Sequence, residues 1–378
     1  MTWRDCRLGD VLTLMRGHDL PADSRQDGDV PVVSSSGITG YHSEAKATAP
    51  GVVTGRYGTL GEVFYLEQDY WPLNTALYVV DFKGTDPRFA AYFLRNVLRY
   101  YQSDKAAVPG VDRNVLHEIK VRTPEPKTQM KIADLLSAYD DLMENNRRRM
   151  RLLEEAARLL YQEWFVRLRF PGHEHARLCD GIPEGWERRR IGDIADCVGG
   201  GTPSTTVSAY WDGGENTWVT PTDVTRNKYI VLLDSAKKIT EAGLKNSSAK
   251  LVPPHAVLMT SRASVGFFAI AGRDVCTNQG FISVVPQDAV FSTFLLFHLM
   301  ERVEEIRTMG SGSTYPEVSR GKFREFQVLI PPRRFVVDFD EQATLLLKQI
   351  RVLKQQNQKL RAARDLLLPR LMSGEIQL

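Results

Sequence analysis

Apolar residues recur every seven positions in two stretches of the chain, which is the spacing of a helix that packs against another helix. In the first stretch, from Pro124 to Phe170, one row consists of Ile132, Tyr139, Asn146, Leu153 and Leu160, and the other of Leu136, Met143, Met150, Ala157 and Trp164. Prolines at the beginning of this stretch favour the start of a helix, and the turn residues after Phe170 favour its end. The spacing predicts one long helix between them.

The same spacing returns near the end of the chain, from Phe339 to Met372. Its rows are Leu346, Leu353, Leu360 and Leu367, and Ile350, Asn357, Arg364 and Leu371. Because an amphipathic helix gains most of its stability from packing its apolar face, each stretch needs a partner. We therefore expect the two helices to pair as an antiparallel coiled coil, which would hold the regions preceding them apart.

Each pair of rows contains one asparagine inside the seam between the helices, Asn146 in the first and Asn357 in the second. A buried polar residue in such a seam fixes the register of the helices at a cost in stability. The alternative is that both side chains face solvent at the edge of the seam. The pattern alone favours neither interpretation.

Before each predicted helix, short runs of β-branched and aromatic residues alternate with turn residues, which is typical of strands. Residues 89–101 have helical spacing instead. We predict an α+β fold of two similar mixed α/β domains separated by two long helices. The expected boundaries are 1–122 for the first domain, 123–170 for the first helical region, 171–184 for a linker, 185–330 for the second domain and 331–378 for the second helical region.

Five short motifs occur twice in the same order. Arg7-Leu8-Gly9-Asp10 returns 183 residues later as Arg190-Ile191-Gly192-Asp193, and the other four return 204 to 207 residues later. These four pairs begin at Val53 and Met259, Asn74 and Asn278, Pro109 and Pro316, and Ala156 and Ala362. Ordered matches of this kind indicate an internal duplication with pseudo-twofold symmetry.

Composition narrows the class of protein. Of 378 residues, 43% are hydrophobic and 25% charged, as in ordinary globular proteins, and the net charge of +3 is compatible with nucleic-acid binding without requiring it. Apolar runs are interrupted by charged residues and the N-terminus lacks the core of a signal peptide, so we expect a cytoplasmic protein without a membrane partner. The scattered cysteines predict reduced thiols.

Recognisable catalytic motifs are missing from the sequence. There is no phosphate-binding loop, no Asn-Pro-Pro-aromatic tetrapeptide of amino-methyltransferases and no metal-ligand spacing; His173 and His175 lack a third ligand and are better interpreted as solvated. The glycines at 199–201 suggest a flexible loop that lets the backbone approach a partner closely. The chain is interpreted as a binding module without a metal site.

Loops in both domains combine hydroxyl, amide, aromatic and arginine side chains, which contact phosphates and base edges in DNA complexes. The candidate DNA-binding residues are Ser34, Ser35, Ser36, Arg56, Tyr57, Thr59 and Asn74 in the first domain, and Thr202, Ser204, Tyr210, Thr220, Asp223, Arg262, Ser264, Asn278, Gln279, Ser313 and Tyr315 in the second. Ordinary turns have similar composition, so it is the duplication that favours a site. Arg56 and Arg262 are preferred because each follows a β-type run.

Several motifs resemble those of specificity subunits of type I restriction–modification systems. They are residues 131–141 (Lys-Ile-Ala-Asp-Leu-Leu-Ser-Ala-Tyr-Asp-Asp), 144–146, 163–166, 368–376 and the paired Arg-x-Gly-Asp starts. The resemblance implies that each domain reads one half of a bipartite target in double-stranded DNA. It also implies that the helices set the spacing and dock two modification subunits, while a restriction subunit translocates and cleaves DNA.

The same resemblance implies that this chain has no catalytic site or cofactor of its own. S-adenosylmethionine, ATP and Mg²⁺ would act on the partner subunits of a DNA adenine methyltransferase and restriction endonuclease. The positions assigned to docking and helix packing are Ile132, Leu136, Tyr139, Asn146, Leu153, Leu160, Trp164, Leu346, Leu353, Asn357, Leu360 and Leu367. The alternative is a coiled-coil scaffold that joins two protein-binding domains without DNA.

Overall fold

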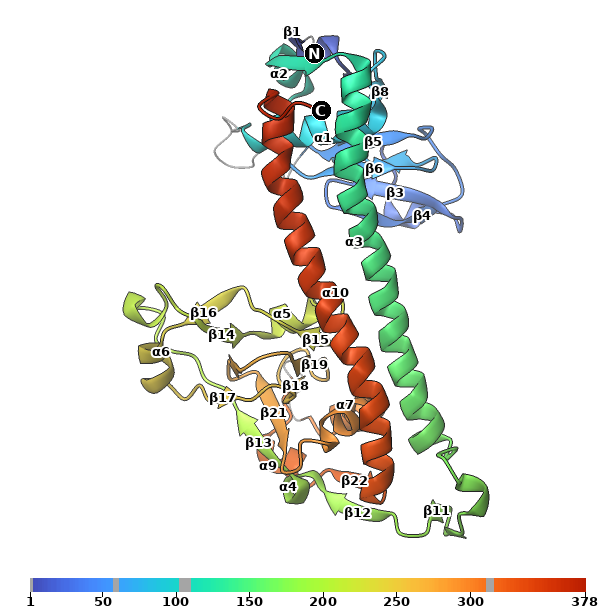
Figure 1. The fold of residues 1–378 in the computed structure, drawn as a ribbon, viewed down its shortest axis with the longest axis vertical. Helices are drawn as coiled ribbons and strands as arrows, with labels where there is room; N and C mark the ends of the chain where they lie inside the picture. Colours follow the sequence, from blue (N-terminus) through green and yellow to red (C-terminus); the bar gives the residue numbers. More distant parts are fainter. Residues whose placement is uncertain (1–2, 57–60, 102–109, 311–315) are drawn as a thin grey trace. The chain divides into compact units, whose positions relative to one another are not determined.

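A computed structural model describes residues 3–56, 61–101, 110–310 and 316–378 (Figure 1). The chain forms two compact units. Unit 1 combines Met1–Glu144 with Asn357–Leu378, and unit 2 consists of Asn145–Gln356. Each long helix therefore contributes one part to each unit.

Unit 1 packs two β-sheets against each other, with strand orders β2-β8-β5-β6 and β4-β3-β7. The strands are β2 (Thr13–Arg16), β3 (Val30–Ser34), β4 (Gly37–His42), β5 (Gly51–Gly55), β6 (Val63–Leu66), β7 (Trp71–Pro72) and β8 (Ala76–Asp81). A separate antiparallel pair joins β1 (Trp3–Arg7) to β9 (Lys120–Pro124) directly before the first long helix. Helices α1 (Pro87–Arg99) and α2 (Arg113–Glu118) complete the domain, and α1 confirms the predicted helix near residues 89–101.

Unit 2 has the same plan with more elements. Its sheets have the orders β13-β21-β18-β19-β15 and β16-β14-β20-β17. The strands are β13 (Ala195–Gly199), β14 (Asn216–Val219), β15 (Val231–Leu232), β16 (Lys237–Ile239), β17 (Leu251–Val252), β18 (Val257–Thr260), β19 (Phe268–Ala271), β20 (Val275–Thr277) and β21 (Phe281–Pro286). Two short strand pairs join β10 (Leu178–Cys179) to β11 (Ile182–Pro183) and β12 (Glu187–Arg190) to β22 (Gln327–Ile330). The helices are α4 (Ile191–Ile194), α5 (Pro221–Thr225), α6 (Glu241–Lys245), α7 (Phe291–Glu301), α8 (Val303–Thr308) and α9 (Arg320–Arg324).

Strand pairing confirms the duplication. In unit 1, β3 pairs antiparallel with β4 and parallel with β7; in unit 2, β14 pairs antiparallel with β16 and parallel with β20. The order β2-β8-β5-β6 likewise matches β13-β21-β18-β19. The second domain therefore repeats the topology of the first, with β15 and β17 as additional edge strands.

The alternation of side chains along β5 and β18 corrects one detail of the predicted repeat. Val53 packs between the two sheets of unit 1, as Leu258 does in unit 2, whereas Met259 faces the opposite core under α7. Because neighbouring residues of a strand face opposite sides, Val53 corresponds to Leu258. The predicted match of Val53 with Met259 is therefore wrong by one residue.

The first long helix, α3, extends over Pro126–Tyr161 and continues as a π-helical turn over Gln162–Val166. It is shorter at both ends than predicted. At its start, Pro124 is still paired in strand β9, and after its end Leu168 adopts a left-handed backbone with φ of 57°. The second long helix, α10 (Arg333–Ser373), begins earlier than predicted, because the buried Phe335 and Val336 extend its packed face towards the N-terminus.

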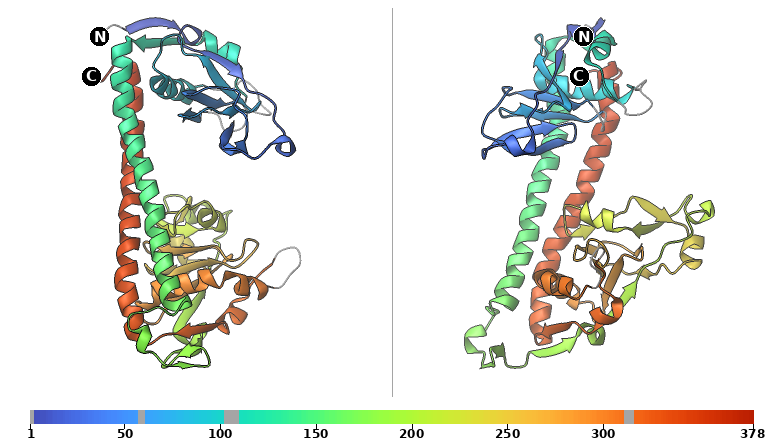
Figure 2. Two further views of the ribbon diagram at one scale, coloured as in Figure 1. Left: turned by 90° about the vertical axis from the view of Figure 1, so that its right-hand side faces the viewer. Right: turned by 180° about the vertical axis from the view of Figure 1, so that it is seen from behind.

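Within each unit the two long helices lie side by side and antiparallel. In unit 1, Asn357 Nδ2 donates to Met143 O (3.1 Å), Arg364 pairs with Asp140, and Lys131 Nζ donates to Leu378 O (3.3 Å), so the C-terminus lies beside the start of α3 (Figure 2). In unit 2, Phe339 of α10 contacts the rings of both Tyr161 and Trp164. The predicted antiparallel pairing is present in both units, while supercoiling of the helices stays a prediction.

The seven-residue rows occupy the packed faces. Leu136, Met143, Met150, Ala157 and Trp164 are buried, as are Ile132, Asn146 and Leu353; Tyr139, Leu153, Leu160, Leu346, Asn357, Leu360 and Leu367 are half-buried. Asn146, at 1% exposure, does not face solvent, so the structure agrees with the buried interpretation of this residue.

The four cysteines are unpaired. Cys276 is buried, Cys6 and Cys197 are half-buried and Cys179 is exposed, all as free thiols, as predicted. In the part of the chain that the structure describes, no helix has the length and apolarity needed to cross a membrane.

Candidate nucleic-acid interface

In unit 2, backbone hydrogen bonds join the loops that follow strands β13, β14, β18 and β20. Gly201 N donates to Thr277 O (2.9 Å), Asn278 N to Val219 O (2.9 Å), and Ser261 N to Gly280 O (2.8 Å). The loops after β13, β14, β18 and β20 therefore meet at one edge of the two-sheet layer. Such bonding makes this edge a rigid platform for the side chains that it carries.

Glycine is required where these loops touch. A Cβ atom at Gly200 would lie 2.0 Å from Asn278 O, and one at Gly201 would lie 2.1 Å from Ser248 Oγ. Both distances are too short for any side chain. The glycine-rich run was predicted as a flexible loop that approaches a partner, but its close approach is to other loops of the same domain.

Unit 1 contains the same network. His18 N donates to Pro72 O (2.8 Å), Leu73 N to Val33 O (2.8 Å), and Arg56 N to Thr75 O (2.9 Å). A Cβ atom at Gly17 would lie 2.2 Å from Leu73 O, so glycine is required here as well. The duplication thus preserves a loop platform in each domain.

Backbone bonding also identifies equivalent residues on the two platforms. Val111 N donates to Arg56 O (2.9 Å), and Val318 N donates to Ser261 O (2.9 Å). Arg56 therefore corresponds to Ser261, and Arg262 stands one residue further along. The two preferred arginines lie on matching loops but not at matching positions.

Several candidate residues of the second domain lie on this platform, although some have local partners. Thr202 Oγ1 donates to Gln279 Oε1, and Asn278 Oδ1 accepts from Gly280 N (2.9 Å). Thr220 donates to Asp223 Oδ2 from both its backbone N (2.8 Å) and Oγ1 (2.6 Å), which caps α5. The Thr220–Asp223 pair therefore has a structural role, whereas Thr202 and Gln279 are exposed.

Other candidates lie elsewhere or serve local turns. Ser204 and Tyr210 lie on the long connection between β13 and β14, where Ser204 O accepts from Trp211 Nε1 (3.0 Å). In the first domain, the buried Ser34 Oγ donates to Gly37 O (3.2 Å) and lies 3.0 Å from Ser36 Oγ, with Ser35 half-buried at the same hairpin.

On the first platform, Asn74 Nδ2 donates to Asp19 Oδ1, and Arg56 is half-buried. Four further candidates, Tyr57, Thr59, Ser313 and Tyr315, lie outside the described residues.

Arg262 is presented by a tight turn. Thr260, which is fully buried, accepts from Gly266 N at its carbonyl (2.9 Å) and from Phe267 N at its Oγ1 (2.9 Å), and Ala263 adopts a left-handed backbone with φ of 61°. Ala263 N also donates to Pro316 O (3.1 Å). The Arg262 side chain, 55% exposed, extends from this turn with its Nε 3.7 Å from Glu317 Oε2, while Ser264 is exposed on the same turn.

Two features were missed by sequence reasoning. Glu317 was noticed only as part of a repeated motif, because its approach to Arg262 depends on a bridge between distant segments. The seven-residue pattern identified only the packed rows of the long helices and missed the apolar residues on their outward faces. Exposed apolar residues nevertheless lie there: Leu152, Leu159 and Val166 stand seven residues apart on α3 and its π-helical turn, and α10 exposes Leu345, Val352 and Leu366.

The described residues contain no group of three or more histidine, cysteine or acidic side chains able to hold a metal ion. Two copies of a two-sheet domain, each with a rigid loop platform and each packed on two long helices, define a duplicated recognition module. The model of the type I restriction modification DNA specificity domain matches residues 1–155 and 183–360, and the chain belongs to this family.

Individual relatives agree with this assignment. The MjaIX specificity subunit of Methanocaldococcus jannaschii is 38% identical over 152 residues, a match that spans 40% of this chain and 35% of that protein. The HindI specificity subunit of Haemophilus influenzae is 20% identical over 337 residues and 73% of each chain. The S subunit structure from M. genitalium shares the fold, with a TM-score of 0.62 and 16% identity over 98% of this chain and 96% of that one.

Proposed function

We propose that this chain is the DNA-specificity subunit of a type I restriction–modification complex. Residues 1–122 and 185–330 each read one half of a bipartite duplex target. The observation that supports this most directly is the loop platform, which occurs once in each domain with the same backbone bonding. Rigid platforms suit base readout, because discrimination depends on side chains that are held in place before binding.

Residues 123–170 and 331–378 are the spacer and docking regions in this proposal. Their buried rows pack within the units, so docking falls to the outward apolar residues, of which Leu152 is 65% and Leu366 71% exposed. Each modification subunit would cover one such row and carry S-adenosylmethionine, while ATP and Mg²⁺ act with a restriction subunit. This chain contributes no catalytic group, and the complex acts in the cytoplasm.

The test is selection of duplexes from a randomised pool by the assembled complex of this chain with its modification subunit. We expect one bipartite sequence to be enriched, with binding that weakens steeply as salt rises because phosphate contacts release counterions. Methylated adenine should then appear in that sequence when S-adenosylmethionine is added. A complex that binds all duplexes alike would contradict the proposal and leave the protein-binding scaffold as the alternative.

Residue roles follow from single substitutions. Arg56→Ala should relax selectivity in one half-site and Arg262→Ala in the other, each by about 1–3 kcal/mol. Arg188→Ala, on the exposed strand β12, serves as a control of equal charge change. If neither platform variant altered either half-site, the assignment of these arginines would be wrong even though the complex still bound selectively.

A further inference from the structure

The turn that carries Arg262 also fixes the position of an acidic side chain. Arg262 and Glu317 form an isolated antiparallel β-bridge, and the neighbouring Val318 N donates to Ser261 O (2.9 Å). Both backbones are therefore held on the platform. The two side chains, 55% and 50% exposed, meet at its surface rather than in the core.

The contact involves one edge of the guanidinium. Arg262 Nε lies 3.7 Å from Glu317 Oε2, and no hydrogen bond joins the terminal nitrogens of Arg262 to another residue in the described part of the chain. The ion pair leaves both terminal nitrogens of this exposed side chain available to a ligand. Those two nitrogens can form the bidentate contact to O6 and N7 of guanine in the major groove.

At the position of Glu317 the first domain has a glycine. The bond from Val111 to Arg56 is equivalent to the bond from Val318 to Ser261, so the residue at the place of Glu317 is Gly110. The glutamate at this position is therefore not shared by the two domains. A general need of the fold does not explain the glutamate, because the equivalent position in the first domain is a glycine.

We propose that Glu317 is a specificity-determining residue of the second domain: its carboxylate holds the Nε edge of Arg262, so that the guanidinium reads a guanine and is not available to the phosphates of unrelated sequences. This rests on the proposed function. Glu317 acts through Arg262 and is a positioning residue. Its negative charge repels a phosphate that approaches Arg262, whereas a guanine edge accepts hydrogen bonds from the terminal nitrogens without displacing it.

The test compares Glu317→Gln with the original chain in the assembled complex. The probes are the duplex enriched from the randomised pool and a scrambled duplex of the same composition, each titrated between about 50 and 200 mM salt. Glutamine keeps an oxygen at the same place and removes the charge. Glu325→Gln is the matched control, since Glu325 pairs with Arg190 at 3.0 Å and is 64% exposed.

For Glu317→Gln, affinity for the scrambled duplex should rise about 2- to 5-fold, and its salt dependence should steepen by about one phosphate contact. Selectivity for the enriched base pairs of the second half-site should fall by at least as much, with the first half-site unchanged. Glu317→Asp, which keeps the charge, should restore most of the selectivity. Glu325→Gln should change none of these values.

Repeating the substitution in Arg262→Ala shows whether Glu317 acts through the arginine. In that background Glu317→Gln should have no further effect on selectivity. An equal gain of non-specific binding with and without Arg262 would overturn the proposal, because it would make Glu317 only a general negative charge. If Arg262→Ala itself left selectivity intact, the assignment of the arginine would fail first; if no sequence were enriched at all, the proposed function would fail.

Discussion

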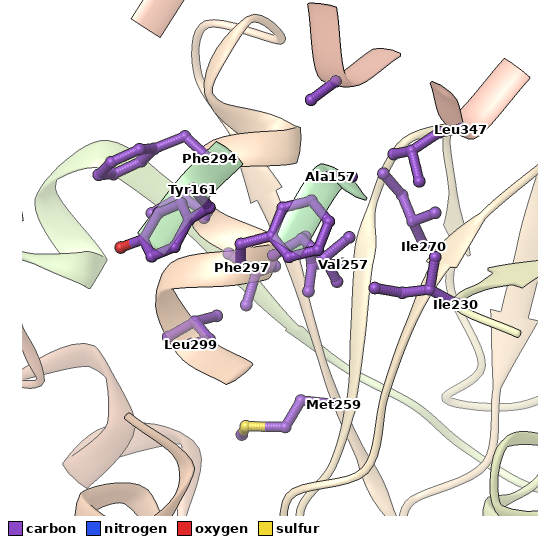
Figure 3. Packing of buried hydrophobic residues seen from close by; sticks show 14 of the residues in the cluster. Ala157, Tyr161, Ile230, Val257, Met259, Ile270, Phe294, Phe297, Leu299 and Leu347 are labelled. Carbon is purple, nitrogen blue, oxygen red and sulfur yellow. The ribbon is translucent and has the colours of Figure 1, made fainter. Parts of the chain in front are cut away.

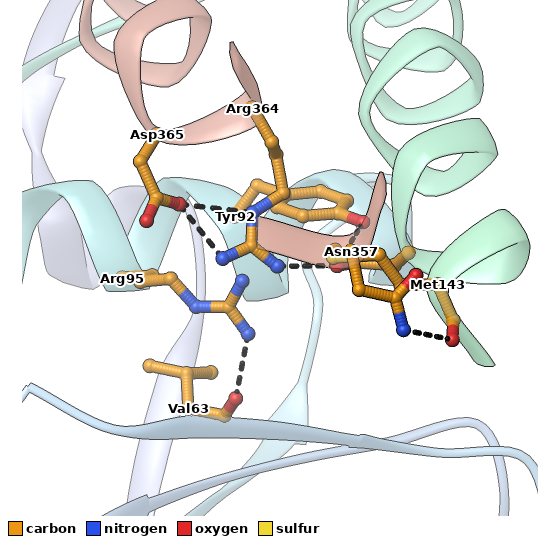
Figure 4. Close-up of polar contacts among 8 residues, drawn as sticks. Val63, Tyr92, Arg95, Met143, Asn357, Arg364 and Asp365 are labelled. Atoms are coloured by element: carbon orange, nitrogen blue, oxygen red, sulfur yellow. Dashed lines mark hydrogen bonds and ion pairs between the residues drawn. The ribbon is translucent and has the colours of Figure 1, made fainter. Parts of the chain in front are cut away.

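The two domains are anchored to the long helices by different chemistry, although they share one fold. Both domains pack apolar side chains on the helices, but unit 1 adds a polar anchor: Tyr92 of α1 donates to Asp140 Oδ2 of α3 (2.5 Å), and Arg364 of α10 pairs with both Asp140 and Asp365 (Figure 4). The Arg364 side chain is only 14% exposed. A charged cluster at the base of one domain thus joins all three helices.

In unit 2 the equivalent anchor is aromatic. Tyr161 of α3 lies among the rings of Phe294, Phe297 and Phe339, close to the buried strands of the first sheet (Figure 3). Its polar partner is His298 of α7, whose Nδ1 lies 2.8 Å from Tyr161 Oη. Because Arg302, which has only donors, lies 3.4 Å from Nε2, the neutral ring accepts there and donates from Nδ1 to Tyr161.

A further contact fixes unit 2 to both helices. Glu154 Oε2 of α3 accepts from Ile230 N (2.8 Å), and Lys354 Nζ of α10 donates to Asn227 Oδ1 (2.6 Å) and Val231 O (2.8 Å). Burial raises the pKa of Glu154 and lowers the pKa of Lys354 to about 8. The difference between the units teaches that one topology can be joined to its helices by different side chains.

The largest expected effect comes from removing an aromatic ring of the second anchor. Phe339 is fully buried among four rings, so Phe339→Ala leaves a cavity and should lower the stability of unit 2 by about 3–5 kcal/mol. Urea unfolding measures the loss, and hydrogen exchange locates it. The exposed Leu345 on the same helix is the control, since Leu345→Ala should cost less than about 0.5 kcal/mol. Equal loss of protection in unit 1 would contradict separate anchors.

The second largest effect is expected from acid, which should destabilise the anchor of unit 2 through protonation of His298. Burial lowers the pKa of His298 from 6.5 to about 3, because the surrounding rings disfavour the charged form. The neutral ring favours the folded state, so its contribution is complete above pH 6.5 and is lost as pH falls towards 3. The cost should be about 2 kcal/mol at pH 5.

The measurement is the free energy of unfolding of unit 2 between pH 7 and pH 4. His298→Gln should lower stability at pH 7 but flatten this dependence, since glutamine does not titrate. An unchanged pH profile in the variant would show that other titratable groups of unit 2 cause the acid sensitivity.

Breaking the polar anchor should cost less. Arg364→Met leaves Asp140, which is 33% exposed, without its main cationic partner, and solvent can compensate in part. We expect a loss of about 1–2 kcal/mol from unit 1. A double-mutant cycle with Asp140→Asn should give a coupling energy of about 0.5–2 kcal/mol, read by urea unfolding and by exchange in α1. Zero coupling would show that the cluster does not act as an anchor.

The sequence predicted the long helices and their packed rows from the regular spacing of apolar residues. It predicted the duplication from motifs that recur in the same order. It misplaced Val53 by one residue, since matching letters ignores the alternation of faces along a strand. It also could not find the contact of Arg262 with Glu317, which depends on a bridge between segments far apart in the chain. The candidate DNA-binding residues were chosen by chemistry, and the Thr220–Asp223 pair shows that the same chemistry serves a helix cap.

We expect the smallest change in stability from replacing Asn146 and Asn357, the asparagines between the two helices. These substitutions nevertheless test most directly whether the helices set the distance between half-sites. Asn146 is buried at 1% exposure, and Asn357 Nδ2 donates to Met143 O (3.1 Å), so a side chain of α10 is tied to one particular turn of α3. Leucine at either position replaces a polar group with an apolar one, so Asn146→Leu and Asn357→Leu should change stability by less than about 1 kcal/mol.

Without the polar contact, neighbouring registers of the two rows become closer in energy. The assembled complex should then select duplexes with more than one distance between half-sites from a pool in which that distance varies. If both variants select the same single distance as the original chain, the spacing is set by the anchors at the two domains and not by the asparagines.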